Sequence, residues 1–183
     1  MERGCGRINI WLAAILAITP ASAQVMSGAG GGVSTLFAAA PTSSNGNGAD
    51  TTEDTIAACG YTVSAAQLAS IGDRLHIVAA GNFAASTDNK TARIKLGGVT
   101  QVSVSGTTAG QTSWRSDTYF VKNGSNTQVN AGFGAANANI TNTTSTGALT
   151  DTNTIAITVT GQNATTATAN SITCTLILVE FTP

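Results

Sequence analysis

Apolar and polar side chains alternate along most of the chain from about residue 55 onward, and this alternation is typical of half-buried β-strands. The pattern predicts eight strands, at residues 56–63, 75–79, 91–96, 99–104, 112–121, 128–133, 153–160 and 172–181. No segment has the three- and four-residue apolar spacing of an amphipathic helix. We therefore expect an all-β protein, a jelly-roll β-sandwich of about eight antiparallel strands, with an immunoglobulin-like sandwich as the alternative.

Several segments between these strands carry turn or loop signals. Gly97-Gly98 and Asn123-Gly124 are typical two-residue hairpin turns. Residues 64–70 fit either a loop or a single helical turn, and the small, polar residues 134–150 predict a long surface loop. The last strand is apolar on both faces at residues 176–179, which indicates a central strand or one buried by a subunit contact.

The N-terminal part of the chain lacks this strand pattern. Residues 1–23 resemble a secretory signal peptide, with basic residues, an apolar run too short to span a membrane and a small-residue cleavage pattern at residues 21–23. The alternatives are an uncleaved arm that docks on a partner and a wrongly chosen start. Residues 24–50 predict a flexible Gly/Ala/Ser-rich arm, in which Leu36 and Phe37 pack on a neighbouring subunit or on the domain's edge. The sandwich itself is then expected at residues 51–183.

Composition narrows the functional classes. Only 9% of residues are charged and the net charge is −1, so the basic surface of a nucleic-acid-binding protein is absent. Polarity comes instead from Thr, Ser, Asn and Gln, and Thr suits pleated strands. We expect no nucleic-acid partner and no membrane span.

Two cysteines remain after Cys5 of the leader. Cys59 and Cys174 could form one disulfide in an exported protein, or they could be two buried thiols that pack as small apolar residues. Together with a single histidine they do not make a zinc ligand set.

Few residues of the chain are candidates for catalysis. Strand alternation predicts that His76 faces outward as a solvated residue. In the alternative, a hydrolase, His76 would have to lie beside a nucleophile and a carboxylate such as Asp117. We therefore expect no catalytic residues and no cofactor. Glu180 either pairs with Arg74 or Arg93 or faces outward on an edge strand.

A calcium site would be the one metal alternative. It could use Asp50, Glu53 and Asp54 with backbone carbonyls, but the spaced acidic loop of such sites is missing. We expect no metal.

The aromatic residues of one strand divide between two faces. Trp114 and Phe120 share one face and Tyr119 lies on the other, because side chains alternate along a strand. Core packing is the first interpretation. The alternative is a surface or glycan contact at Trp114 and Tyr119.

The order of short motifs resembles jelly-roll domains of tailed-phage virion proteins, of the tumour-necrosis-factor-like type found on tail fibres, spikes and capsid surfaces. The resemblance covers about residues 35–183 and rests on Leu36-Phe37, 45–50, Thr51-Thr52-Glu53-Asp54, Gly72-Asp73-Arg74-Leu75, Lys90-Thr91, Ile94-Lys95-Leu96-Gly97-Gly98, Trp114-Arg115 and Val179-Glu180-Phe181.

The resemblance implies a homotrimer and a non-enzymatic structural role on a virion, where other virion proteins or a cell-surface glycan or protein would be partners. The alternative is an exported carbohydrate-binding or adhesin module of a bacterium. The expected location is accordingly the virion for a phage protein, and otherwise the periplasm or the outside of the cell.

Overall fold

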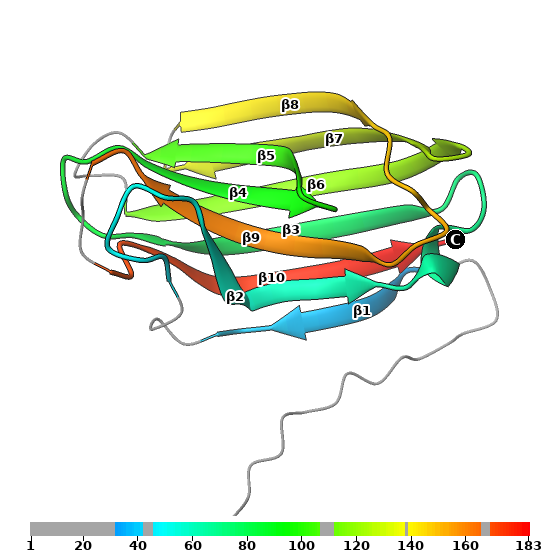
Figure 1. Ribbon diagram of the computed structural model, residues 1–183, viewed down its shortest axis with the longest axis horizontal. Coiled ribbons are helices and arrows are strands. Elements are labelled where there is room, and N and C mark those ends of the chain that lie inside the picture. The colour runs from blue at the N-terminus through cyan, green and yellow to red at the C-terminus, as the bar shows by residue number, and fades with distance from the viewer. Residues whose placement is uncertain (1–31, 42–45, 107–111, 138, 166–168) are drawn as a thin grey trace, which may run out of the picture.

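The computed structural model describes residues 32–41, 46–106, 112–137, 139–165 and 169–183, which form one all-β sandwich (Figure 1). The signal-like residues 1–23 and residues 24–31 of the expected arm lie outside these ranges. No helix in the described ranges is long and apolar enough to cross a membrane.

In the described ranges, ten antiparallel strands make up two sheets. The six-stranded sheet has the order β1-β10-β3-β6-β7-β8 and the four-stranded sheet the order β2-β9-β4-β5. The elements are β1 (Ser34–Ala39), β2 (Asp54–Val63), the 3-10 helix η1 (Ala65–Leu68), β3 (Arg74–Phe83), β4 (Lys90–Leu96), β5 (Val99–Gly106), β6 (Ser113–Gly124), β7 (Thr127–Ala136), β8 (Asn139–Gly147), β9 (Ile155–Asn163) and β10 (Ile172–Thr182).

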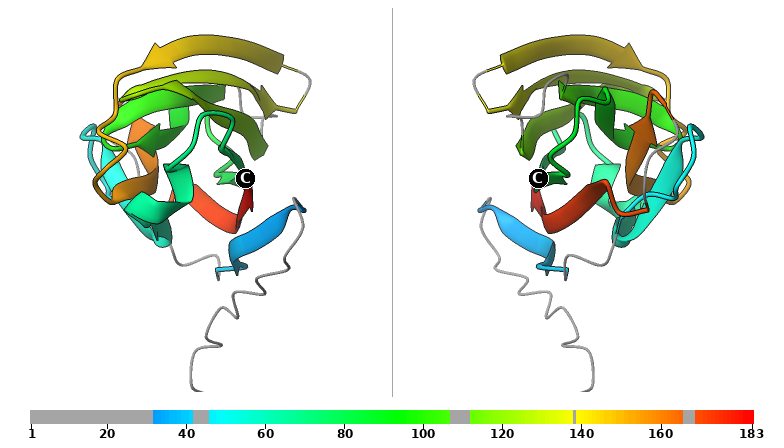
Figure 2. Two further views of the ribbon diagram at one scale, coloured as in Figure 1. Left: turned by 90° about the vertical axis from the view of Figure 1, so that its right-hand side faces the viewer. Right: turned by 90° about the vertical axis from the view of Figure 1, so that its left-hand side faces the viewer.

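The winding is that of a jelly roll. The chain crosses from one sheet to the other between β1 and β2, β2 and β3, β3 and β4, β5 and β6, β8 and β9, and β9 and β10. Without β7 and β8, four strands of each sheet remain, and Figure 2 shows the two layers face to face around one core. The predicted jelly-roll sandwich is therefore confirmed, and β7 with β8 widens one of its sheets.

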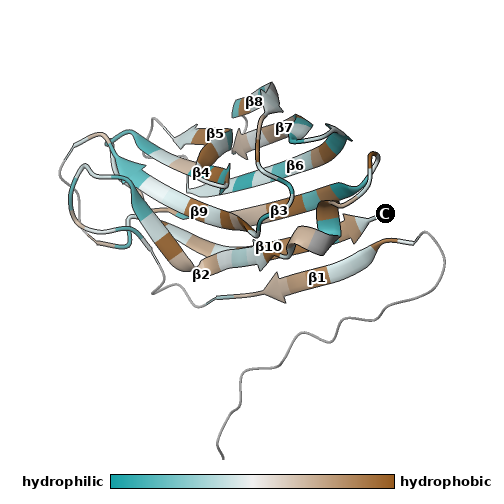
Figure 3. Cartoon of the chain, turned by 45° about the vertical axis from the view of Figure 1, so that its right-hand side comes forward, coloured by the Kyte–Doolittle hydropathy of each residue, from teal (hydrophilic) through white to brown (hydrophobic). Residues whose placement is uncertain are grey.

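The core lies between the sheets and is built from the alternating positions of the strands. Leu75 and Ile77 of β3 and Phe120 of β6 are fully buried from one side, and Ile94 and Val159 from the other. Apolar and polar bands alternate along the strands in Figure 3. Burial of these rows is the main force that holds the two layers together.

The Thr-rich region that was expected to be a long surface loop is mostly strand. β7 continues to Ala136, and residues 139–147 form β8, which pairs with β7 along its whole length. The expectation for 134–150 was wrong because β8 is an edge strand whose described side chains are exposed or half-buried. Such a strand needs no apolar alternation, whereas its β-branched Thr residues favour extended backbone.

The expected flexible arm also contains a strand, so the boundary at residue 51 was placed too late. β1 pairs with β10, with Ser34 opposite Phe181 and Ala39 opposite Ile177. Leu36 is buried in the main core, which agrees with the alternative in which it packs on the domain's edge.

The turns follow the sequence in part. Gly97 and Gly98 both have positive φ, 53° and 83°, which confirms the predicted hairpin turn between β4 and β5. The next turn was placed wrongly: β6 runs through Gly124, and residues 125–126 make the turn, with Asn126 at φ 52°. Residues 65–68 form the single helical turn that was one of two expectations.

A disulfide joins the two sheets. The sulfur atoms of Cys59 in β2 and Cys174 in β10 are 2.00 Å apart, and both residues are fully buried. Both lie where the strand register shifts, next to a bulge. Of the two alternatives for these cysteines, the structure has the disulfide. The 115-residue separation corresponds to about 4–5 kcal/mol of loop-closure entropy in the chain-entropy model.

Candidate functional site

A row of polar side chains crosses the outer face of the six-stranded sheet. Register places Glu180 of β10 opposite His76 of β3, and His76 opposite Tyr119 of β6. The neighbours Leu75 and Ile77 point into the core, so His76 points outward. The sheet therefore brings together residues that are 41 to 104 positions apart in the chain.

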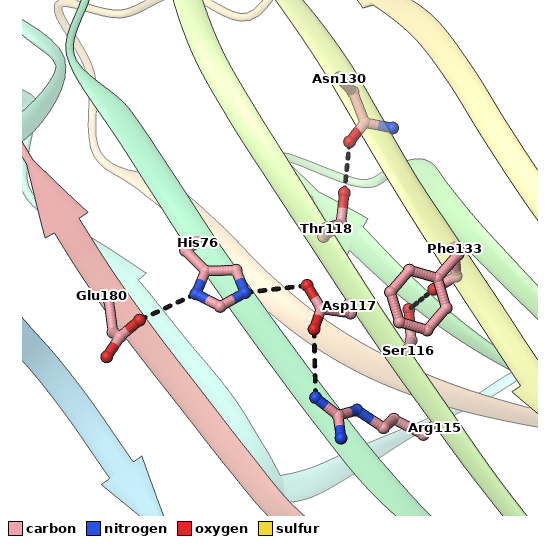
Figure 4. A network of polar contacts seen from close by, with 8 residues as sticks. All are labelled: His76, Arg115, Ser116, Asp117, Thr118, Asn130, Phe133 and Glu180. Carbon is pink, nitrogen blue, oxygen red and sulfur yellow. Dashed lines mark hydrogen bonds and ion pairs between the residues drawn. The ribbon is translucent and has the colours of Figure 1, made fainter.

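His76 lies between two carboxylates (Figure 4). Its Nδ1 is 2.8 Å from Oε2 of Glu180, and its Nε2 is 2.8 Å from Oδ1 of Asp117. Arg115 donates to the other oxygen of Asp117 at 3.2 Å. The imidazole also stacks on the ring of Tyr119, with 4.3 Å between centroids and 7° between planes. We call His76, Asp117, Glu180 and Arg115 the His76 cluster.

Both ring nitrogens of His76 have a partner within the His76 cluster. Each faces a carboxylate oxygen, which accepts a hydrogen bond when that nitrogen carries the proton. The ring is therefore held at both edges by groups from the neighbouring strands.

His76 faces outward as expected, but it is not the solvated side chain that was expected. The side chain faces outward, but it is only 21% exposed and is held on both edges. Glu180 was expected either to pair with Arg74 or Arg93 or to face outward on an edge strand. It faces outward, but β10 lies between β1 and β3, and Glu180 pairs with His76. Arg93 lies on the other sheet, where Glu53 is its ion partner at 3.7 Å.

Apolar side chains lie on the same outer face as the His76 cluster. Of the eight large apolar residues that are exposed in the described ranges, five lie on this face: Tyr119, Val129, Phe133, Ile140 and Leu176. Val78 also points to this side, where it is 6% exposed and lies opposite Leu178 and Asp117. We call these six residues the apolar patch. The concentration of exposed apolar side chains on one face makes that face a candidate interaction surface.

The outer face of the four-stranded sheet is polar by comparison. Glu53 is contacted there by Lys95 at 3.0 Å, by Arg93 and by the hydroxyl of Thr160. The Thr160 hydrogen bond, with smaller contributions from Lys95 and Arg93, outweighs desolvation and lowers the pKa of Glu53 below its usual 4.5. The two outer faces of the sandwich thus differ in chemistry.

Trp114 cannot be the surface or glycan contact that was one alternative. It is 2% exposed, packs near Phe83 and donates its indole N–H to the carbonyl of Thr173 at 3.0 Å. Gly81 makes room for this contact, because a side chain there would meet both Thr173 and the indole. Trp114 and Phe120 share the buried face as predicted, and Tyr119, 45% exposed, remains the candidate for surface contact.

The three acidic residues considered for calcium have other partners. Asp50 accepts from Thr52, Asp54 accepts from the backbone N–H of Gly48, and Glu53 forms the ion pairs described above. No group of three metal-ligating side chains with the geometry of a metal site occurs in the described ranges.

Sequence reasoning found His76 and Glu180 separately but not the His76 cluster. Alternation along the strand placed His76 on an outer face, whereas Glu180 was left either paired with an arginine or facing outward. The pairing depends on the register between β10, β3 and β6, and register is set by the tertiary fold.

Comparison of the chain with family models, with curated proteins and with solved structures finds no match.

Proposed function

We propose that this chain is a non-enzymatic structural protein of the phage-virion type, whose copies associate through the outer face of the six-stranded sheet. The apolar patch carries this proposal: most of the exposed large apolar residues in the described ranges lie on that one face. The number of copies, three, comes from the resemblance to trimeric virion jelly rolls.

The His76 cluster supports a role in contact rather than in catalysis. A general base must have a nitrogen available for the proton of a nucleophile. Here both ring nitrogens face carboxylates at 2.8 Å, and Tyr119 covers one face of the ring. Such a network can instead fix side chains on a surface and give an interface polar specificity.

The contrast between the two outer faces supports an orientation for the assembly. The apolar patch would face the other copies, and the hydroxyl- and amide-rich face of the four-stranded sheet would face solvent or an external partner. In a symmetric oligomer every copy uses the same surfaces for association, so one apolar face on each copy fits such an assembly.

Light scattering of the full chain tests the association. The expected mass is three times the chain mass of 18.3 kDa. Val129→Asp should shift the protein to the monomer at the same concentration, because it buries an unpaired charge in the interface. Val99→Asp is the matched control, since Val99 is also an exposed strand valine, 50% against 39%, but lies on the four-stranded sheet. A monomeric wild type, or equal effects of the two variants, would overturn the proposal.

A further inference from the structure

A polar pocket lies at one end of the four-stranded sheet, away from the apolar patch. Its volume is about 440 Å³, and it is lined by Thr51, Thr91, Gln162, Asn163 and Ala164. A pocket of this size falls in the usual range for small-molecule sites, about 300–1,000 Å³. It lies where β4 begins and β9 ends, beside the segment that precedes β2.

Hydrogen bonds hold the walls of the pocket in place. Thr91 and Gln162 are opposite each other across β4 and β9. Gln162 donates from Nε2 to the carbonyl of Thr51 at 3.1 Å, so the segment before β2 is tied to β9. Asn163, 1% exposed, donates to the carbonyl of Asp50 at 3.2 Å and accepts from Ser171 at 2.6 Å. The pocket is therefore preformed, which limits the entropy lost on binding.

The groups that line the pocket are neutral hydrogen-bonding groups. Gln162 donates one N–H of Nε2 to Thr51, and its amide can offer a second N–H and the acceptor Oε1. The hydroxyl of Thr91 is 3.2 Å from that of Ser105, and either can donate or accept. No lining residue carries a charge or a large apolar side chain. This set suits a ligand that offers several neighbouring hydroxyl groups.

We propose that this pocket binds one neutral hexose unit of a glycan. Sugar hydroxyls both donate and accept, so they can satisfy the Thr51 and Thr91 hydroxyls and the Gln162 carbonyl together. A few such hydrogen bonds at one site give weak affinity for a sugar. An assembly that carries several copies of the site would bind a multivalent glycan more tightly. The proposal does not depend on self-association, because the apolar patch lies on the other sheet.

Saturation-transfer NMR on the full chain tests the pocket, with glucose, galactose, mannose and N-acetylglucosamine as probes and glucuronate as the charged comparison. We expect saturable binding of at least one neutral sugar. Thr91→Val removes one hydroxyl at nearly constant shape and should weaken binding roughly tenfold, the value of one well-placed hydrogen bond. Thr51→Val should also weaken it.

Thr158→Val is the matched control, because Thr158 lies on β9 outside the pocket. It should bind as the wild type does. Thermal unfolding of each variant separates a lost contact from a lost fold. Absence of saturable binding by every neutral sugar, tighter binding of glucuronate, or unchanged binding by both pocket variants would overturn the proposal. None of these results bears on the mass measured by light scattering.

Discussion

The hydroxyl of Thr160 lowers the pKa of the Glu53 carboxyl group on the outer face of the four-stranded sheet. Its hydrogen bond to Glu53 is the largest cause of the lowered pKa of that residue. A folded pKa below the unfolded value means that Glu53 stabilises the fold above pH 4.5, and that this stability is lost as the pH falls through the folded pKa. Because the site is partly exposed, the contribution is small, below about 1 kcal/mol.

We expect Thr160→Val to raise the pKa of Glu53 toward its usual value. An NMR titration of the Glu53 side-chain carboxyl between pH 2 and 7 measures the change. Thr158→Val, two residues away on the same face of β9, should leave the titration as it is. An unchanged Glu53 titration in Thr160→Val would show that Lys95 and Arg93, rather than the hydroxyl, set the pKa.

At the scale of elements, β1 shows that a short edge strand can belong to the core. It pairs only with β10, yet Leu36 reaches the main hydrophobic cluster and Phe37 stacks on Tyr61 of β2, with ring centroids 5.2 Å apart. β1 thus contacts strands of both sheets and covers one edge of the sandwich.

Leu36→Ala should lower the free energy of unfolding by about 2–4 kcal/mol, because it leaves a cavity at a side chain that is 3% exposed. Urea denaturation with the disulfide intact measures the loss. Val33→Ala, just before β1 and 59% exposed, should change stability by less than about 0.5 kcal/mol. Equal effects would mean that β1 does not pack on the sandwich in solution.

At the scale of the whole molecule, the His76 cluster lies within the face that we propose to be the interface. The charged groups that face His76 are Asp117 and Arg115 from β6 and Glu180 from β10, and Arg74 lies two residues away on β3. If a second copy covers this face, loss of one member of the His76 cluster leaves charged groups buried without their partner, which is unfavourable.

His76→Ala should therefore weaken association, because it leaves the carboxylates of Asp117 and Glu180 without the imidazole that lies between them. Sedimentation velocity at one fixed pH measures the change. Association equal to that of the wild type would place the His76 cluster outside the interface.

Local sequence pattern determined much of this protein. Alternation predicted the core strands and the faces of Trp114, Phe120 and Tyr119, and Gly97-Gly98 predicted its turn. These features follow from residues a few positions apart: side chains alternate along a strand, and glycine adopts positive φ without strain.

Only the tertiary structure decided the features that depend on distant partners. β1 and β8 are strands because β10 and β7 lie beside them, although neither has a strong apolar pattern of its own. Likewise, strand register brings together the residues of the His76 cluster, which are 41 to 104 positions apart, and the packing of the two sheets brings together the cysteines of the disulfide, 115 positions apart. An alternating sequence fixes which face a side chain takes, but the partner it meets there depends on which strands pair and in what register.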